Sequence, residues 1–137
     1  MYFSSSRPSD GEEEGSQDIF YATYKDGIFQ DPLRFGSTIN TDNYEADVYV
    51  DPEEAYMIFC STRQDGLGRG DLYISFRNSD ASWTQAQNMG SLINTANHEL
   101  CPYVTPDGKY FFYTSNEDIW WVSTAVFEDL AKLSHRY

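Results

Sequence analysis

The chain contains few basic residues, few cysteines and no long apolar segment. Its 137 residues include only 9 Lys and Arg against 22 Asp and Glu, which gives a formal net charge of −13. Nucleic acids and anionic membranes are bound through positively charged surfaces, so we expect neither as a partner. No apolar run approaches the roughly 18 residues of a membrane-spanning helix, and the first residues lack the basic head and apolar stretch of a signal peptide. We therefore expect no membrane span.

Aromatic side chains are abundant, in contrast. They make up 17% of the residues, although the mean hydropathy of the chain is only −0.59. Aromatic residues suit the half-buried surfaces of β-sheets, and they are rare in disordered chains. The composition therefore predicts a folded protein rich in β-structure.

An internal repeat organises the sequence. Ile39-Asn40-Thr41 returns as Ile93-Asn94-Thr95 and Glu45 returns as Glu99, in each case 54 residues later. Repeats of this length are typical of propellers and solenoids, in which one copy cannot bury its own apolar face. We divide the chain into three copies within one partial domain, approximately residues 1–42, 43–96 and 97–137.

Each copy contains short apolar runs separated by turn-forming residues. In the second copy, residues 56–60 and 72–76 are nearly continuous apolar runs, which are typical of strands covered on both faces. In the third copy, a Pro-Asp-Gly turn precedes the strand predicted at residues 109–115. Residues 124–133 have apolar side chains at three- and four-residue spacing, which predicts a short amphipathic helix with Thr124 as its N-cap.

These patterns predict an all-β fold of β-propeller blades, about two and a half to three of them, each four-stranded and antiparallel, with a short C-terminal helix. Residues 83–89 are the predicted outer strand of the second copy. We expect the helix to cover the outer edge of the last blade, because an open edge exposes unpaired backbone groups. The predicted core includes Phe59, Tyr73, Phe111, Phe112 and Trp120.

Several segments resemble the TolB-type, WD-like β-propeller repeat of bacterial envelope proteins. They are Tyr-Phe-Ser-Ser-Ser-Arg-Pro at 2–8, Asp-Leu-Tyr-Ile-Ser at 71–75, Ser-Trp at 82–83, Asn-Met-Gly at 88–90, Ile-Asn-Thr at 93–95 and Pro-Tyr-Val-Thr-Pro-Asp-Gly-Lys at 102–109. The ending, Asp-Ile-Trp-Trp-Val at 118–122 followed by a helix, resembles the closing blade of such proteins. The resemblance covers nearly the whole chain.

The resemblance implies a binding and scaffolding role, with a location in the bacterial periplasm or cell envelope. Closed propellers have roughly four to eight blades, so we expect a fragment or an oligomerising part of such a propeller. An incomplete set of blades leaves apolar flanks open, and large apolar patches are rare on soluble monomers. We therefore expect a homo-oligomer, most simply a twofold dimer joined through blade flanks.

The connections between blades supply the candidate binding residues, because such loops line one face of a propeller. His98 precedes Glu99 in one connection, and Tyr44 precedes Glu45 in the earlier copy. Glu45, Arg63, His98 and Glu99 are our candidates for binding a protein partner or a small ligand at the propeller rim. Glu45 and Glu99 can instead be structural, accepting backbone hydrogen bonds or pairing with Arg63, and both interpretations stay open.

Cys60 and Cys101 are expected to be free thiols. Their positions in the preceding copy carry Ser4 and Asp47, so the repeat contains no cysteine pair. Cys60 also lies within an apolar run, where burial disfavours the thiolate that a nucleophile needs.

The acidic loop from Asp10 to Asp18 offers oxygen ligands of the kind that bind calcium. Its spacing does not match the twelve-residue loop of calcium-binding helix–loop–helix motifs. A calcium site and a solvated loop remain alternatives.

No catalytic motif is present in the sequence. It lacks Gly-x-Ser-x-Gly, His-Glu-x-x-His and a phosphate-binding glycine loop, and its two histidines have no metal-ligand spacing. We expect a non-catalytic binding module without a cofactor. The alternative is a carbohydrate-active hydrolase or lyase that uses carboxylates at the propeller rim, since acidic residues are plentiful.

Overall fold

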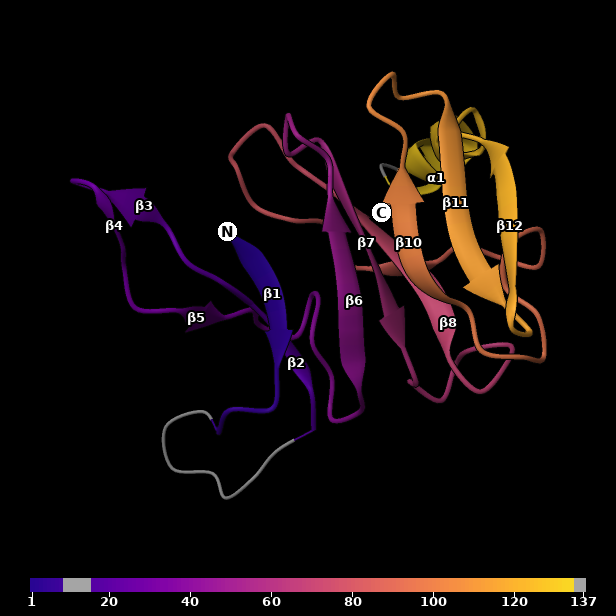
Figure 1. The fold of residues 1–137 in the computed structure, drawn as a ribbon, viewed down its shortest axis with the longest axis horizontal. Helices are drawn as coiled ribbons and strands as arrows, with labels where there is room; N and C mark the ends of the chain where they lie inside the picture. The colour runs from indigo at the N-terminus through magenta and orange to yellow at the C-terminus, as the bar shows by residue number, and fades with distance from the viewer. Residues whose placement is uncertain (9–15, 135–137) are drawn as a thin grey trace.

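The computed structural model describes residues 1–8 and 16–134 and consists of antiparallel β-sheets and one short helix (Figure 1). The first sheet has the order β1-β2-β5, with β1 at Tyr2–Ser5, β2 at Asp18–Tyr21 and β5 at Leu33–Arg34. The second has the order β6-β7-β8-β9, with bounds Glu45–Val50, Tyr56–Ser61, Asp71–Phe76 and Gln87–Asn88. The third contains β10 (Leu100–Val104), β11 (Tyr110–Ser115) and β12 (Asp118–Ser123), followed by α1 (Val126–Ser134).

The three sheets stand side by side in chain order, as Figure 1 shows. Strand β6 contacts β1 of the first sheet and β10 of the third. The all-β prediction is confirmed, and so is the short C-terminal helix. The described sheets do not close into a ring, and their assignment as propeller blades stays a prediction. The described part of the chain also contains no helix that is long and apolar enough to cross a membrane.

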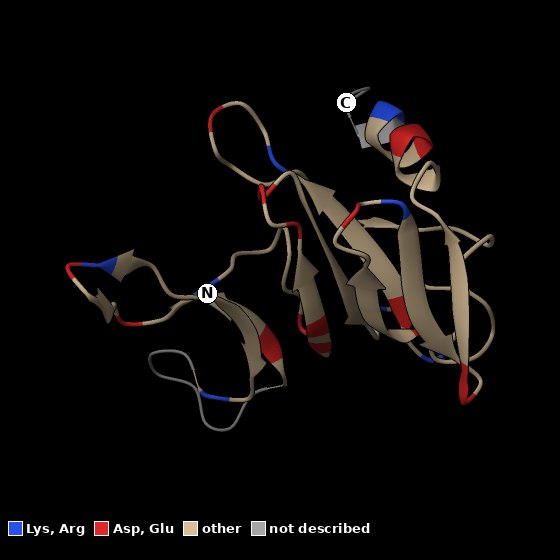
Figure 2. Cartoon of the chain, turned by 45° about the horizontal axis from the view of Figure 1, so that its top comes forward, with Lys and Arg blue, Asp and Glu red and all other residues tan. Residues whose placement is uncertain are grey.

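The second sheet supplies the centre of the core. Every residue of β8 is buried, as are five of the six in β7, because the first and third sheets cover its two faces. The predicted runs at residues 56–60 and 72–76 lie within these strands. Charged residues lie mainly at strand ends and in turns, which leaves the sheet surfaces largely uncharged (Figure 2).

The outer strand predicted at residues 83–89 is wrong over most of its length. Only β9, at Gln87–Asn88, forms a strand, and Trp83 makes an isolated bridge with Arg77. The backbone pairing is interrupted at Thr84, whose N–H donates to the Phe76 carbonyl but whose hydroxyl, in place of its carbonyl, accepts from the backbone N–H of Phe76 at 2.9 Å. In a regular strand pair a backbone carbonyl would accept this hydrogen bond, and here the Thr84 hydroxyl accepts it.

A backbone bulge recurs in the first strand of the second and third sheets. Asp47 in β6 and Cys101 in β10 both have positive φ, 53° and 54°, at the point where the pairing register shifts. The backbone N–H of Cys101 donates to Asp47 Oδ2 at 3.3 Å. The repeat therefore specifies a local backbone shape, and its two copies bond directly to each other.

The C-terminal helix exists but covers a different surface from the one predicted. Phe127 and Leu130 are buried in one cluster with Ile58, Ile74 and Phe111, between the second and third sheets. Among the described residues, no strand pairs with the outer edge of β12. Our prediction of an edge cover was wrong because the amphipathic pattern specifies a buried face without specifying its partner.

Thr124 does not cap this helix. Its hydroxyl donates to the carbonyl of Gly108 at 2.6 Å, which ties the start of the helix to the β10–β11 turn. The hydroxyl of Ser123 accepts from the backbone N–H of Ala125 instead.

The core prediction is correct for three residues and wrong for one. Phe59, Tyr73 and Phe111 have at most 1% of their surface exposed, and Phe112 is half-buried. Trp120, in contrast, is 54% exposed. It lies on β12, the last strand of the third sheet, and no further strand among the described residues pairs with that edge.

Candidate functional site

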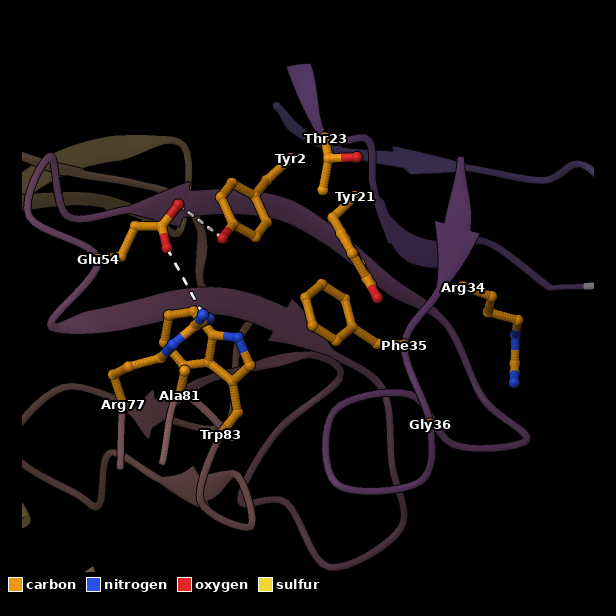
Figure 3. Close-up of a pocket in the computed structure, with 10 residues that line it drawn as sticks. All are labelled: Tyr2, Tyr21, Thr23, Arg34, Phe35, Gly36, Glu54, Arg77, Ala81 and Trp83. Atoms are coloured by element: carbon orange, nitrogen blue, oxygen red, sulfur yellow. Dashed lines mark hydrogen bonds and ion pairs between the residues drawn. The ribbon is translucent and has the colours of Figure 1, made fainter. Parts of the chain in front are cut away.

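A pocket opens where the first and second sheets meet, with a volume of about 350 Å³. Figure 3 shows its lining, in which aromatic rings lie between Glu54 and Arg77 at one end and Arg34 at the other. The lining residues are Tyr2, Tyr21, Thr23, Arg34, Phe35, Gly36, Glu54, Arg77, Ala81 and Trp83. We call this the aromatic pocket.

Four aromatic rings form its wall. Tyr2 and Phe35 lie almost parallel, with ring centroids 6.2 Å apart and an interplanar angle of 8°. Trp83 stands nearly perpendicular to Tyr2, at 87°, and Tyr21 packs against Phe35 with centroids 4.8 Å apart. These contacts link β1, β2 and the segment after β5 to the loop that follows β8.

The charged edge consists of Glu54 and Arg77. The Tyr2 hydroxyl donates to Glu54 Oε1 at 2.8 Å, and Glu54 Oε2 lies 3.7 Å from the Arg77 guanidinium. Arg77 also stacks over Trp83, 4.8 Å from the ring centroid. Burial, and then the bond to Glu54, raise the pKa of the Tyr2 hydroxyl to about 12, so it remains a donor at neutral pH.

A tight turn places Glu54 at this edge. Asp51 Oδ2 accepts hydrogen bonds from the backbone N–H groups of Glu53 and Ala55. Glu54 adopts a positive φ of 55° within this turn, and the N–H of Arg77 donates to the carbonyl of Ala55. The β6–β7 turn and the end of β8 are thereby fixed to each other, which holds the carboxylate and the guanidinium close together.

The residues predicted from sequence lie at the opposite end of the strands from this pocket. Glu45 and Glu99 are completely buried. Glu45 accepts hydrogen bonds from the N–H and hydroxyl of Thr41 and from the hydroxyl of Ser61, and Glu99 accepts the equivalent bonds from Thr95 and Ser115. Because no ligand can reach a fully buried carboxylate, this geometry favours the structural interpretation for both residues.

Arg63 belongs to the same buried network. It donates to the carbonyl of Ile39 at 2.7 Å, lies 3.5 Å from Glu45 Oε1 and stacks over Tyr73. Arg7 stacks in the same way over Phe3 and Phe20 in the first copy. The arginine thus recurs as part of the repeat, buried at Arg63 and exposed at Arg7.

His98 is half-buried, and its Nε2 lies 3.3 Å from Cys60 Sγ. A cysteine beside a histidine is the arrangement of a cysteine nucleophile. Burial, and then the nearby carboxylates beginning with Asp47, raise the pKa of the Cys60 thiol to about 12. The thiolate is therefore disfavoured, and the pair is unsuited to nucleophilic catalysis. A ligand role for His98 stays a prediction.

Both cysteines are free, as predicted. Cys101 is exposed and Cys60 is buried, so we expect iodoacetamide at pH 8 to modify the native protein once, at Cys101. The thiolate fraction at Cys60 is negligible four pH units below its pKa of about 12. Intact mass should show one adduct on the native chain and two after unfolding in guanidinium chloride. Two adducts on the native chain at equal rates would contradict the burial of Cys60.

The calcium alternative falls mainly on residues 10–14, which lie outside the described residues. Asp18, at the end of that loop, binds Arg34 through two hydrogen bonds of 2.7 and 3.0 Å. Within the described ranges, no group of three or more His, Cys, Asp or Glu side chains is placed to hold a metal ion.

Comparison with protein-family models, with curated proteins and with solved structures finds no match to this chain. The resemblance to TolB-type propeller repeats therefore stays a prediction.

The aromatic pocket was not predicted from the sequence. Its residues come from five separate segments, and Tyr2 and Trp83 entered the sequence analysis only as parts of the propeller-like segments. One signal was present, because the register that pairs Cys60 with Ser4 also pairs Ile58 with Tyr2. A tyrosine that replaces an aliphatic core residue marks a place where the first copy departs from the second.

Proposed function

We propose that the protein is a non-catalytic binding module, built from propeller-type repeats, that holds a small ligand in the aromatic pocket. The observation that carries this proposal is the pocket itself. It combines several aromatic faces with an acidic and basic pair, Glu54 and Arg77, and a second arginine, Arg34. Mostly apolar walls with a few convergent polar groups are characteristic of small-molecule sites.

The contact between the second and third sheets is filled by the chain itself, unlike the contact between the first and second sheets. At the same end of the strands, Phe127 from α1 packs against Tyr56 and Phe111, with ring centroids 5.1 and 5.4 Å apart. The chain thus inserts its own helix at the second contact between sheets. At the first contact, the loop that carries Trp83 leaves the aromatic pocket open.

A hydrolase or lyase is less well supported. Glycoside hydrolysis uses two carboxyl groups that flank one bond, whereas among the described residues Glu54 is the single carboxylate that lines the aromatic pocket. Glu45 and Glu99 are buried, and their oxygens already accept hydrogen bonds.

An NMR titration tests the proposed function. The ¹⁵N-labelled protein is screened against a library of small polar and aromatic fragments, and amide shift changes are mapped onto the chain. We expect the changes to cluster at the pocket, around Phe35, Glu54 and Arg77, and to be absent at Glu45 and Glu99. No response, or shifts spread evenly over the surface, would contradict a binding role for the pocket.

Self-association is the second part of the proposal. The outer face of the third sheet exposes Tyr103, Tyr110, Ile119 and Trp121, which the strand register places on one side. Apolar patches of this kind commonly mark protein interfaces. We expect two copies to pair through this face, with a charge of −13 on each chain opposing the contact.

Light scattering at micromolar concentration tests the pairing. In about 0.15 M salt we expect twice the chain mass of 15.8 kDa, with tighter association at higher salt because screening weakens the repulsion. Replacing Ile119 and Trp121 with serine should give a monomer. Leu92→Ser is the matched control, since Leu92 is exposed and lies outside this face. A wild-type monomer at every concentration would exclude the dimer.

A further inference from the structure

We infer that the aromatic pocket binds a neutral saccharide, with one sugar ring packed against the Tyr2 and Phe35 rings and its hydroxyl groups bonded to Glu54 and Arg77. This inference rests on the proposed function, because it names the ligand class of the same pocket.

The aromatic wall suits the apolar face of a sugar. A pyranose ring presents C–H groups on its flat faces and hydroxyl groups around its edge, so it packs flat on an aromatic ring while its edge stays polar. The near-parallel Tyr2 and Phe35 rings supply such a surface, and Trp83 closes one side at 87° to Tyr2. Large, rigid aromatic side chains contribute most of the contact area in sites of this kind.

The polar edge suits neighbouring hydroxyl groups. A hydroxyl both donates and accepts, and two adjacent hydroxyls can donate to a carboxylate and accept from a guanidinium at the same time. Glu54 Oε2 and the Arg77 guanidinium lie 3.7 Å apart. Their side chains are 47% and 28% exposed, so both can reach a ligand in the pocket.

The charges favour a neutral ligand over a charged one. Arg77 already lies over the Trp83 ring, 4.8 Å from its centroid, which fills the position that a cationic ligand would occupy. Arg34 is bound to Asp18 at 2.7 Å, so its charge is balanced by the protein. The negative charge of Glu54 repels an anionic ligand and neutralises the positive charge of Arg77.

The volume limits the ligand to a small saccharide. The pocket measures about 350 Å³, at the lower end of the range of roughly 300–1,000 Å³ for ligand pockets. One ring in the pocket, with a second ring at its mouth, fits this space.

Isothermal titration calorimetry tests the inference with six probes. Four are neutral, namely cellobiose, maltose, lactose and N,N′-diacetylchitobiose, and two are charged, namely choline and glucuronate. We expect at least one neutral disaccharide to bind with a Kd of about 1 mM, a weak affinity suited to a shallow polar site, and the charged probes to bind at least tenfold more weakly. Tighter binding of choline or glucuronate would overturn the inference.

Glu54→Gln should weaken disaccharide binding by about tenfold, because it removes a charged acceptor of the ligand's hydroxyl groups. Glu53→Gln is the matched control, since it makes the same chemical change at the next, exposed residue, which does not line the pocket. Both variants should keep the wild-type melting temperature. Equal binding by the two variants would show that the sugar lies elsewhere and would overturn the inference. If no saccharide binds while the NMR fragments still map to the pocket, the inference fails and the proposed function stands.

Discussion

Replacing Phe127 and Leu130 with serine should lower the free energy of unfolding by about 5 kcal/mol or more. Both side chains are buried in the cluster that joins the second and third sheets. Truncating a buried Phe costs about 3–5 kcal/mol and a buried Leu about 2–5 kcal/mol, because contacts are lost and a cavity remains. Since small domains are stable by only about 5–15 kcal/mol, the double variant should be largely unfolded or only marginally stable.

Urea denaturation followed by circular dichroism measures this loss. Glu128→Ser is the control, because Glu128 lies on the same helix with its side chain exposed. It makes a helix-propensity change similar to that of Leu130→Ser without a cavity, so we expect a cost below about 1 kcal/mol. The double variant should also associate, since loosening α1 uncovers Tyr56 and Phe111. Equal denaturation midpoints for the double variant and the control would mean that α1 does not hold the two sheets together.

The central strands were predictable because their signals are local. Continuous apolar runs specify strands covered on both faces, and β7 and β8 follow the predicted runs to within one residue. The helix was predictable in its extent for the same reason. Its partner was not, because the sheet contact that receives Phe127 and Leu130 is set by residues far away in the chain.

Equivalent positions in a repeat do not have equivalent environments. Trp83 is buried, and its edge faces Tyr2 of the preceding sheet. Phe29, which is 54 residues earlier, lies in the hairpin formed by β3 (Tyr24–Lys25) and β4 (Ile28–Phe29), and it is exposed. That hairpin projects away from the three sheets (Figure 1), and among the described residues no further sheet lies beyond the first to pack against it. Burial at a repeated position depends on the neighbouring copy, which the sequence of one copy does not specify.

The candidate site was even less predictable from the sequence than the burial of repeated positions. The sequence repeat identified Glu45 and Glu99 as residues that recur, and each proved to be the centre of a buried hydrogen-bonded network, with Arg63 beside Glu45. Residues that recur in each copy therefore stabilise the fold of that copy. The aromatic pocket is made mostly from residues that do not recur, such as Tyr2 and Glu54, and only the packing of two sheets brings them together.

Glu45→Gln should destabilise the protein more than Glu99→Gln, although the two residues occupy the same position of the repeat. Both carboxylates accept bonds from a threonine N–H, a threonine hydroxyl and a serine hydroxyl. We expect Glu99→Gln to cost about 1–3 kcal/mol, the usual cost of disturbing buried hydrogen bonds. Glu45 also faces the buried guanidinium of Arg63 at 3.5 Å, and a buried charge that loses its partner costs about 3–5 kcal/mol.

A double-mutant cycle with Arg63→Met isolates the charge contribution, because Met keeps an unbranched apolar chain and removes the charge. Urea denaturation should show that Glu45→Gln costs less in the Arg63→Met background than in the wild type, with a remainder close to the cost of Glu99→Gln. The reason is that glutamine then faces no unbalanced cation in either copy. If Glu45→Gln left stability unchanged in the wild-type background, the buried hydrogen bonds of Glu45 would not stabilise the fold, and the structural interpretation of this residue would be wrong.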